Sequence, residues 1–152
     1  MTTPFDLLTE QERKEIRLPG GSLMTIMLEQ VAKVAADQPL VTMLTIELEP
    51  GSAGSPRHLH PGPVFGYVLE GDLLFQCEGT RQMVYREGDV FWEPGIDRPH
   101  LLAANPNPDR RTRFLAVCVG VQGQPVTQFI EASPDAAKNS GPLDRIIGGS
   151  LS

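Results

Sequence analysis

The sequence has little of what nucleic-acid-binding and membrane-spanning proteins need. Its 13 basic side chains are outnumbered by 19 acidic ones, and no basic cluster offsets the net charge of −6. A negative chain repels phosphate backbones and anionic membranes, so we expect neither nucleic acid nor membrane as a partner. No apolar run is long enough to span a bilayer, and residues 1–20 mix acids and bases without one. We therefore expect a soluble, cytoplasmic protein.

Cysteine is also scarce. Cys77 and Cys118 are the only two, they lack the CxxC spacing of metal or redox motifs, and each lies within an apolar run. A buried thiol in such a run acts mainly as a small hydrophobic side chain. We expect both cysteines to be reduced and structural.

Glycine and proline, by contrast, are abundant. The 15 glycines and 14 prolines recur at short intervals and separate runs such as LVTMLTIELE and RFLAVCVG, whose apolar residues partly alternate with polar ones. This pattern is typical of strands joined by tight turns and predicts an all-β barrel or sandwich of roughly ten strands.

The length of the chain suits one domain. We predict an N-terminal arm at 1–20, a barrel at 21–131 and a C-terminal tail at 132–152. The segment TEQERKE is the one competing helix signal, because Thr9 and Glu12 have the spacing of a capping box.

The chain has three histidines, and two of them are separated by a single residue. His58 and His60 would point to the same face of a strand, so that their ring nitrogens could converge on one ion. His100 opens another predicted strand, HLLAA, and could supply a third ligand. A lone histidine is more often an ordinary hydrogen-bonded side chain, but this arrangement favours a metal site.

The segment from Pro50 to Asn105 resembles the cupin superfamily of small double-stranded β-helix (jelly-roll) barrels. The first cupin motif contains a glycine, a His-x-His pair, a glutamate and a further glycine, and the matching residues are Gly51, His58, His60 and Gly71. The second motif contains a glycine, a proline-glycine turn, a histidine and an asparagine, which correspond to Gly88, Pro94, Gly95, His100 and Asn105. The resemblance implies a compact single-domain cupin.

The glutamate of the first motif is missing. Val64 stands at its expected position, and the neighbouring Phe65 is no ligand either. Three neutral imidazoles would leave the charge of a divalent ion to be balanced by water, hydroxide or an anionic substrate. Imidazole suits several metals, and the resemblance to three-histidine cupin dioxygenases favours Fe(II), with Zn, Ni and Mn as alternatives. An empty or lost site is the competing interpretation.

Further residues are candidates for the substrate pocket because of their positions on the predicted strands. They are Val64, Gly66, Gln76, Phe91, Glu93 and Arg98. Glu93 could move a proton or replace the missing ligand, although a solvated loop carboxylate is the simpler interpretation. Arg98 is a candidate carboxylate anchor. Aromatic residues such as Phe91 are equally explained as barrel core.

Two kinds of function fit these features. The first is a metal-dependent enzyme, most concretely a dioxygenase that acts on a small oxygenated molecule, with a sugar-type isomerase or lyase as a variant. The second is a non-catalytic cupin that binds or senses a small ligand. The sequence does not identify a general base that would decide between them.

We also expect a homodimer. Residues 22–35 and 40–49 have the pattern of a long apolar hairpin whose faces offer Leu23, Met27, Met43 and Leu44. Small cupins commonly pair through such N-terminal strands, which implies a two-fold interface with residues 143–147 docking across it. The alternative is that the same residues close the core of a monomer.

Overall fold

The computed structural model describes residues 13–130, and within this range the chain consists of strands, turns and loops without a helix. The strands are β1 (Lys14–Leu18), β2 (Ser22–Ile26), β3 (Leu40–Leu48), β4 (His58–Leu59), β5 (Val64–Glu70), β6 (Leu73–Cys77), β7 (Met83–Tyr85), β8 (Val90–Glu93), β9 (His100–Ala104), β10 (Thr112–Gly120) and β11 (Gln128–Phe129). The all-β prediction is confirmed. None of these residues forms a helix that is long and apolar enough to cross a membrane.

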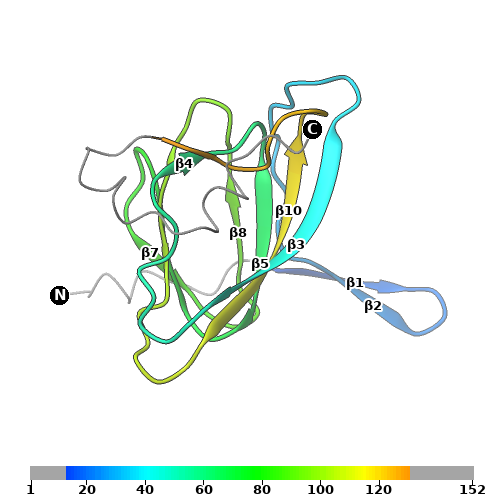
Figure 1. The fold of residues 1–152 in the computed structure, drawn as a ribbon. Coiled ribbons are helices and arrows are strands. Elements are labelled where there is room, and N and C mark those ends of the chain that lie inside the picture. The colour runs from blue at the N-terminus through cyan, green and yellow to red at the C-terminus, as the bar shows by residue number, and fades with distance from the viewer. Residues whose placement is uncertain (1–12, 131–152) are drawn as a thin grey trace.

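Two antiparallel sheets form the body of the protein (Figure 1). One has the strand order β3-β10-β5-β8 and the other β11-β4-β9-β6-β7. From β3 to β11 the chain passes back and forth between the sheets, and only β6 and β7 follow each other within one sheet. Segments distant in sequence therefore lie side by side, as in a jelly roll.

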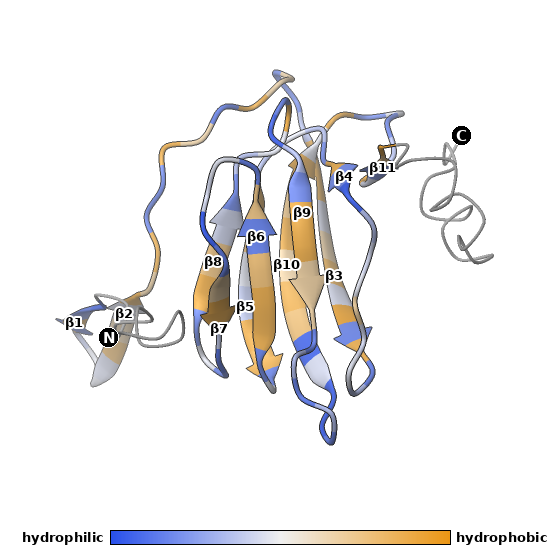
Figure 2. Cartoon of the chain, turned by 90° about the vertical axis from the view of Figure 1, so that its left-hand side faces the viewer, coloured by the Kyte–Doolittle hydropathy of each residue, from blue (hydrophilic) through white to orange (hydrophobic). Residues whose placement is uncertain are grey.

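The space between the sheets is the core, and the strands fill it by alternation. Buried residues alternate with more exposed ones along most of β5, β6 and β10, because successive side chains on a strand point to opposite faces. Val68 and Leu73 are fully buried, and Phe75, Phe91 and Phe114 are at most 4% exposed. Figure 2 shows the apolar strands of the two sheets and the polar turns at their ends.

The hairpin formed by β1 and β2 belongs to neither sheet. It extends away from the two sheets in both views (Figures 1 and 2), and almost all of its residues are exposed. The predicted hairpin between residues 22–35 and 40–49 is wrong, because β2 pairs with β1 and β3 pairs with β10. Residues 27–39 contain no strand. The apolar pattern identified β3 and the part of the first run that forms β2, but not the partners of these strands.

The part of the predicted N-terminal helix that lies within the described residues is a strand and not a helix. Residues 14 and 15, at the end of TEQERKE, lie in β1. Thr9 and Glu12, the proposed capping box, are outside the described residues, as are the predicted tail at 132–152 and its docking segment at 143–147. The β1–β2 hairpin crosses the predicted boundary between arm and barrel at residue 20, because β1 precedes it and β2 follows it.

Candidate metal centre

Strand pairing brings the three histidines to one end of the core. His58 lies on β4, directly opposite His100 on β9, so both side chains point to the same face of the five-stranded sheet. Their ring centroids are 4.8 Å apart, and the centroid of His60 lies 4.8 Å from that of His58. His60 stands just beyond β4, where its carbonyl accepts a hydrogen bond from the amide of Ile96 at 2.7 Å. The structure thus brings together the three predicted ligands.

A carboxylate completes the group, and it comes from β8. Glu93 is paired with Val64 on β5, the position at which the first cupin motif has its glutamate. Residues directly opposite each other on antiparallel strands point to the same face a few ångströms apart. Glu93 therefore offers its carboxylate from the neighbouring strand at the place where Val64 has none. The expectation of a solvated loop carboxylate is wrong, because Glu93 lies in a strand and is 3% exposed.

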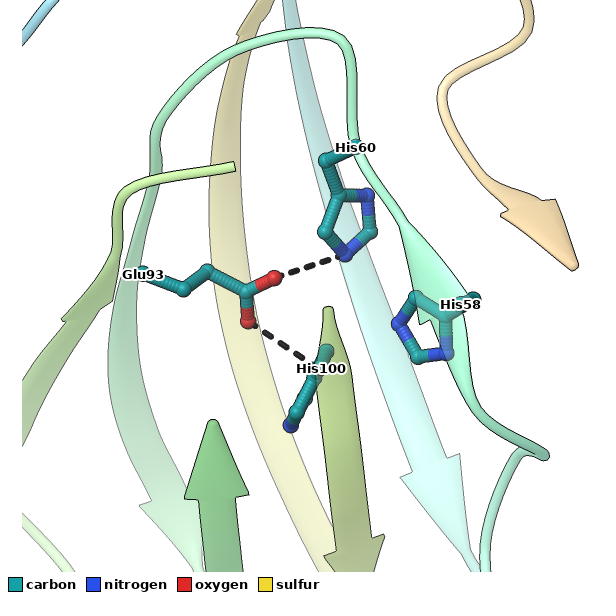
Figure 3. Close-up of side chains that lie close together, drawn as sticks. All are labelled: His58, His60, Glu93 and His100. Carbon is teal, nitrogen blue, oxygen red and sulfur yellow. Dashed lines mark ion pairs between the residues drawn. The ribbon is translucent and has the colours of Figure 1, made fainter. Parts of the chain in front are cut away.

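The four side chains converge on a single point (Figure 3). Oε1 of Glu93 lies 2.8 Å from Nε2 of His60, and Oε2 lies 3.1 Å from Nδ1 of His100. One potential ligand atom from each of His58, His60, Glu93 and His100 lies within 4.8 Å of all the others. All four residues are at most 9% exposed. The expectation of a site without a carboxylate is therefore corrected to three imidazoles and one carboxylate.

Backbone carbonyls fix the orientation of each imidazole. Nδ1 of His58 donates to the carbonyl of Pro56 at 2.7 Å, and Nδ1 of His60 donates to that of Val126 at 2.7 Å. His100 is turned the other way, and its Nε2 donates to the carbonyl of Leu102 at 2.8 Å. In a neutral imidazole the other nitrogen is then a bare acceptor. All three inward nitrogens are thus prepared as metal ligands, as in many metal sites where a second hydrogen bond sets the histidine tautomer.

Burial and mutual contact shift the pKa values of the group. Burial, reinforced by the neighbouring His60, lowers the pKa of His58 to about 4. Burial also lowers the pKa of His100. For His60 and Glu93, burial opposes the charged forms, but their mutual hydrogen bond and attraction prevail, which raises the pKa of His60 and lowers that of Glu93. Without a metal, the contact between His60 and Glu93 favours the charged forms of both, whereas burial favours the neutral forms of His58 and His100.

The donor set fits a cation. Nδ1 of His100 is the one buried side-chain polar atom within residues 13–130 that lacks a hydrogen-bond partner, and it faces a carboxylate oxygen that is also an acceptor. Two acceptors face each other without a proton between them, an arrangement that a positive ion would relieve. Three imidazoles and a carboxylate suit Fe, Mn, Ni and Zn alike. The group could therefore hold a divalent metal ion, and its chemistry does not select which one.

The four side chains lie at the wall of a cavity of about 90 Å³. Most of the wall is apolar, and it includes Val64 and Phe91 as predicted. Ser55 and Thr127 are the polar lining residues other than the four potential ligands, among the residues that the structure describes. The thiol of Cys118 also lines the cavity, and burial raises the pKa of Cys118 to about 12, so it is neutral.

Three predicted pocket residues lie elsewhere. Gln76 alternates with the buried residues of β6, points outward and donates to the carbonyl of Thr80 at 2.9 Å. Gly66 does face the core, but the ring of Phe91 occupies the space in front of it. Arg98 lines a separate groove and does not reach the cavity. Strand alternation decided the position of Gln76, whereas the position of Arg98 follows from the turn before β9.

The family of the chain follows from its sequence and fold together. Residues 44–118 match the model of the Cupin domain family. The range runs from β3 to β10 and contains all four members of the metal centre. The chain belongs to the cupin superfamily. The expected double-stranded β-helix is thereby confirmed. A solved structure of a cupin-like protein from Thermotoga maritima shows the same fold. It is 20% identical, with a TM-score of 0.52, and the match covers 67% of this chain and 74% of that one.

Two further solved structures are similar to this cupin over part of its length. A predicted oxalate decarboxylase from Thermotoga maritima is 27% identical over 52% of this chain and 65% of its own, with a TM-score of 0.43. The polyketide cyclase RemF from Streptomyces resistomycificus is 25% identical over 66% of each chain, with a TM-score of 0.49. The cupin spans slightly less than two thirds of either protein. No curated protein sequence matches it.

Proposed function

We propose that this cupin is a metal-dependent enzyme that acts on a small oxygenated molecule, with a dioxygenase-like reaction as its most concrete form. The convergence of His58, His60, Glu93 and His100 on one point at the wall of a largely apolar cavity is the observation that supports it. All four side chains are buried, and Glu93 pairs with His60 and His100, within the group. A perturbed, buried cluster of this kind is typical of a functional site.

Fe(II) is the metal we propose, with Mn, Ni and Zn as the alternatives that the same donors accept. When bound, the ion would polarise a substrate oxygen and, if it is iron, also react with dioxygen. Three neutral imidazoles and one carboxylate leave a divalent ion with one uncompensated positive charge. The site therefore favours a substrate that contributes a single negative oxygen.

The cavity restricts what this substrate is. A volume of about 90 Å³ is small beside the roughly 300 to 1,000 Å³ of ordinary ligand pockets, so the substrate is a small molecule. Its wall has few hydrogen-bond partners, which disfavours a sugar, because most sugar hydroxyls would be buried unpaired. No lysine or arginine among the described residues lines the cavity. A compact diketone, catechol or thiol fits these limits better than a polyol or a dianion.

The experiment is metal analysis followed by oxygen consumption. The full-length protein is purified without an affinity tag, analysed for bound metal, loaded in turn with Fe(II), Mn, Ni and Zn, and tested against diketones, catechols and thiols. We expect one ion per chain and oxygen uptake with the iron form. Matched His58→Ala protein is the control for adventitious metal. A protein that stays metal-free after every loading would contradict the proposal.

A binding or sensor cupin is the second candidate, and one observation favours it. The titratable groups that line the cavity within residues 13–130 are the four potential ligands and the neutral thiol of Cys118. Once the ligands hold a metal, the described wall offers no separate general acid or base. One bound ion per chain together with saturable binding of a panel compound, without consumption of that compound or of oxygen, would identify this function.

Metal affinity should rise with pH. The hydrogen bond and attraction to Glu93 raise the pKa of His60 and so favour a proton that the metal must displace, whereas His58, with its pKa of about 4, is already neutral at pH 7. Affinity should increase by at most about tenfold per pH unit as His60 loses its proton, and level off above its pKa. Zn titrations by calorimetry between about pH 6 and about pH 8 test this, since His titrates in that range. A flat profile would contradict the release of a proton from His60 on metal binding.

We propose further that the chain forms a homodimer. Isolated two-stranded hairpins are marginally stable in water, yet the β1–β2 hairpin exposes apolar side chains and extends from the body. The outer face of the β3-β10-β5-β8 sheet is also apolar, with Val41 55% and Met43 66% exposed on its edge strand β3. A second copy that covers this edge and receives the hairpin would bury both surfaces.

Replacing Met43 with lysine should disrupt this dimer. A charge on the exposed edge of β3 would oppose burial against a second copy without disturbing the core. Light scattering at micromolar concentration should give twice the chain mass of 16.6 kDa for the native protein and a single chain mass for Met43→Lys. Val31→Lys is the matched control, because Val31 is 95% exposed and lies outside the sheets. A native protein with the mass of one chain would exclude the dimer.

A further inference from the structure

A second concavity lies at the seam between the two sheets. The strands that flank it, β7 and β8, are the edge strands of their sheets and are not paired with each other (Figure 1). The resulting groove has a volume of about 440 Å³ and shares no lining residue with the metal cavity. This volume lies within the range of about 300 to 1,000 Å³ that is usual for small-molecule sites.

The walls of this groove are apolar and rich in aromatic rings. Phe75, Met83, Tyr85 and Trp92 contribute to them. Phe75 and Tyr85 pack edge to face with their centroids 5.6 Å apart, which holds both rings in place. Rigid aromatic walls favour a flat apolar ligand, because they bury its faces without a loss of side-chain freedom.

Two arginines, Arg81 and Arg98, give the groove its charge. Within residues 13–130 neither guanidinium group has an ion pair or a hydrogen bond, whereas Arg57, Arg110 and Arg111 all pair with glutamates. None of the groove's lining residues is acidic. In a protein with a net charge of −6, two unpaired guanidinium groups at one groove form a local positive site.

We propose that this groove binds a flat, apolar molecule that carries a carboxylate, such as an aromatic acid. Its ring would lie among Tyr85, Trp92 and Met83, and its carboxylate would accept hydrogen bonds from Arg81 and Arg98. Guanidinium groups are the preferred partners of carboxylates because their parallel N–H groups match the two oxygens. A cation would be repelled, and a neutral ligand would leave both arginines without a partner.

The binding site has a built-in reporter, since Trp92 is the only tryptophan of the chain. Benzoate is titrated into the full-length protein while Trp92 fluorescence is followed, and calorimetry gives an independent dissociation constant. We expect saturable binding, with benzamide much weaker because it lacks the charge. Arg81→Gln and Arg98→Gln should each weaken binding by about tenfold or more, the usual effect of losing a charge-assisted hydrogen bond.

Three further variants make the result specific. Arg98→Lys keeps the charge but loses the fork geometry, so it should weaken binding less than Arg98→Gln. Arg86→Gln is the matched control, because Arg86 is an exposed arginine that does not line the groove, and it should bind as the native protein does. His58→Ala should also bind normally, since His58 belongs to the separate metal cavity.

Several outcomes would overturn this assignment. Equal affinity for benzoate and benzamide would show that the arginines do not select a carboxylate. Unchanged binding by the Arg81→Gln, Arg98→Gln double variant would place the ligand elsewhere. Loss of binding in His58→Ala would place it in the metal cavity. None of these results depends on whether the metal centre is catalytic.

Discussion

Glu93→Gln is expected to lower metal affinity by more than about a hundredfold, because it removes the only negative charge among the four potential ligands and replaces a good donor with a poor one. The variant has nearly the same shape, so His58, His60 and His100 should stay in place. Metal titration by calorimetry, with the ion content of purified protein as a second readout, measures the change.

The same substitution should leave folding almost unaffected. Removing one partner of a buried ion pair is usually costly because the other charge remains. Here His60 is able to lose its proton, since burial already disfavours its charged form. The new amide also provides a donor for Nδ1 of His100, which lacks one. The free energy of unfolding of the metal-free protein should change by no more than about 1 kcal/mol.

Glu87→Gln is the matched control for Glu93→Gln. Glu87 is exposed and pairs with Arg110 on the surface, 3.3 Å away. Surface ion pairs contribute little, so this variant should match the native protein in both metal affinity and stability. If Glu93→Gln binds metal as tightly as Glu87→Gln does, Glu93 is a structural partner of the histidines and not a ligand.

Gly95→Ala is the second substitution with a large expected effect, because Gly95 holds two ligand-bearing turns together. It follows Glu93 and Pro94 in the turn after β8 and has φ of +66°. A Cβ at this position would overlap the carbonyl of Gly62, in the turn after His60. The neighbouring amide of Ile96 donates to the carbonyl of His60 at 2.7 Å. Adding a methyl group would therefore push His60 and Glu93 apart.

Gly79→Ala is the control that distinguishes the steric clash at Gly95 from the cost of placing alanine in a left-handed backbone conformation. Gly79 has a similar φ of +80°, but nothing lies within 4 Å of a Cβ placed there. Both variants lose about 1 kcal/mol or slightly more from the left-handed backbone. Gly95→Ala should lose about 2 kcal/mol beyond that from overpacking, and its metal affinity should fall by about tenfold or more. Urea unfolding and Zn titration measure the two effects, and equal losses in both variants would contradict the positioning role of Gly95.

Local sequence patterns predicted the all-β class of this protein, several of the strands in its two sheets and three of the four members of its metal centre. Turn residues between alternating apolar runs identified the all-β class, because both signals arise within a few residues of one another. His58 lies in β4 and His60 stands just beyond its end, two residues further on, so their proximity is a local property. The partners of β2 and β3 were predicted wrongly, because strand pairing depends on which surfaces meet and not on the strands themselves.

The fourth member, Glu93, depended on the tertiary structure. In the sequence it stands 29 residues after Val64 and beside a proline-glycine turn, where a solvated carboxylate is the ordinary expectation. Only the register that places it opposite Val64 puts its carboxylate at the position left by the missing glutamate. By contrast, local strand alternation turned Gln76 outward, and the turn before β9 placed Arg98 in a separate groove. The sequence by itself determined the strand pattern and the paired histidines, whereas strand register decided which carboxylate joins them, since register is a relation between segments distant in the chain.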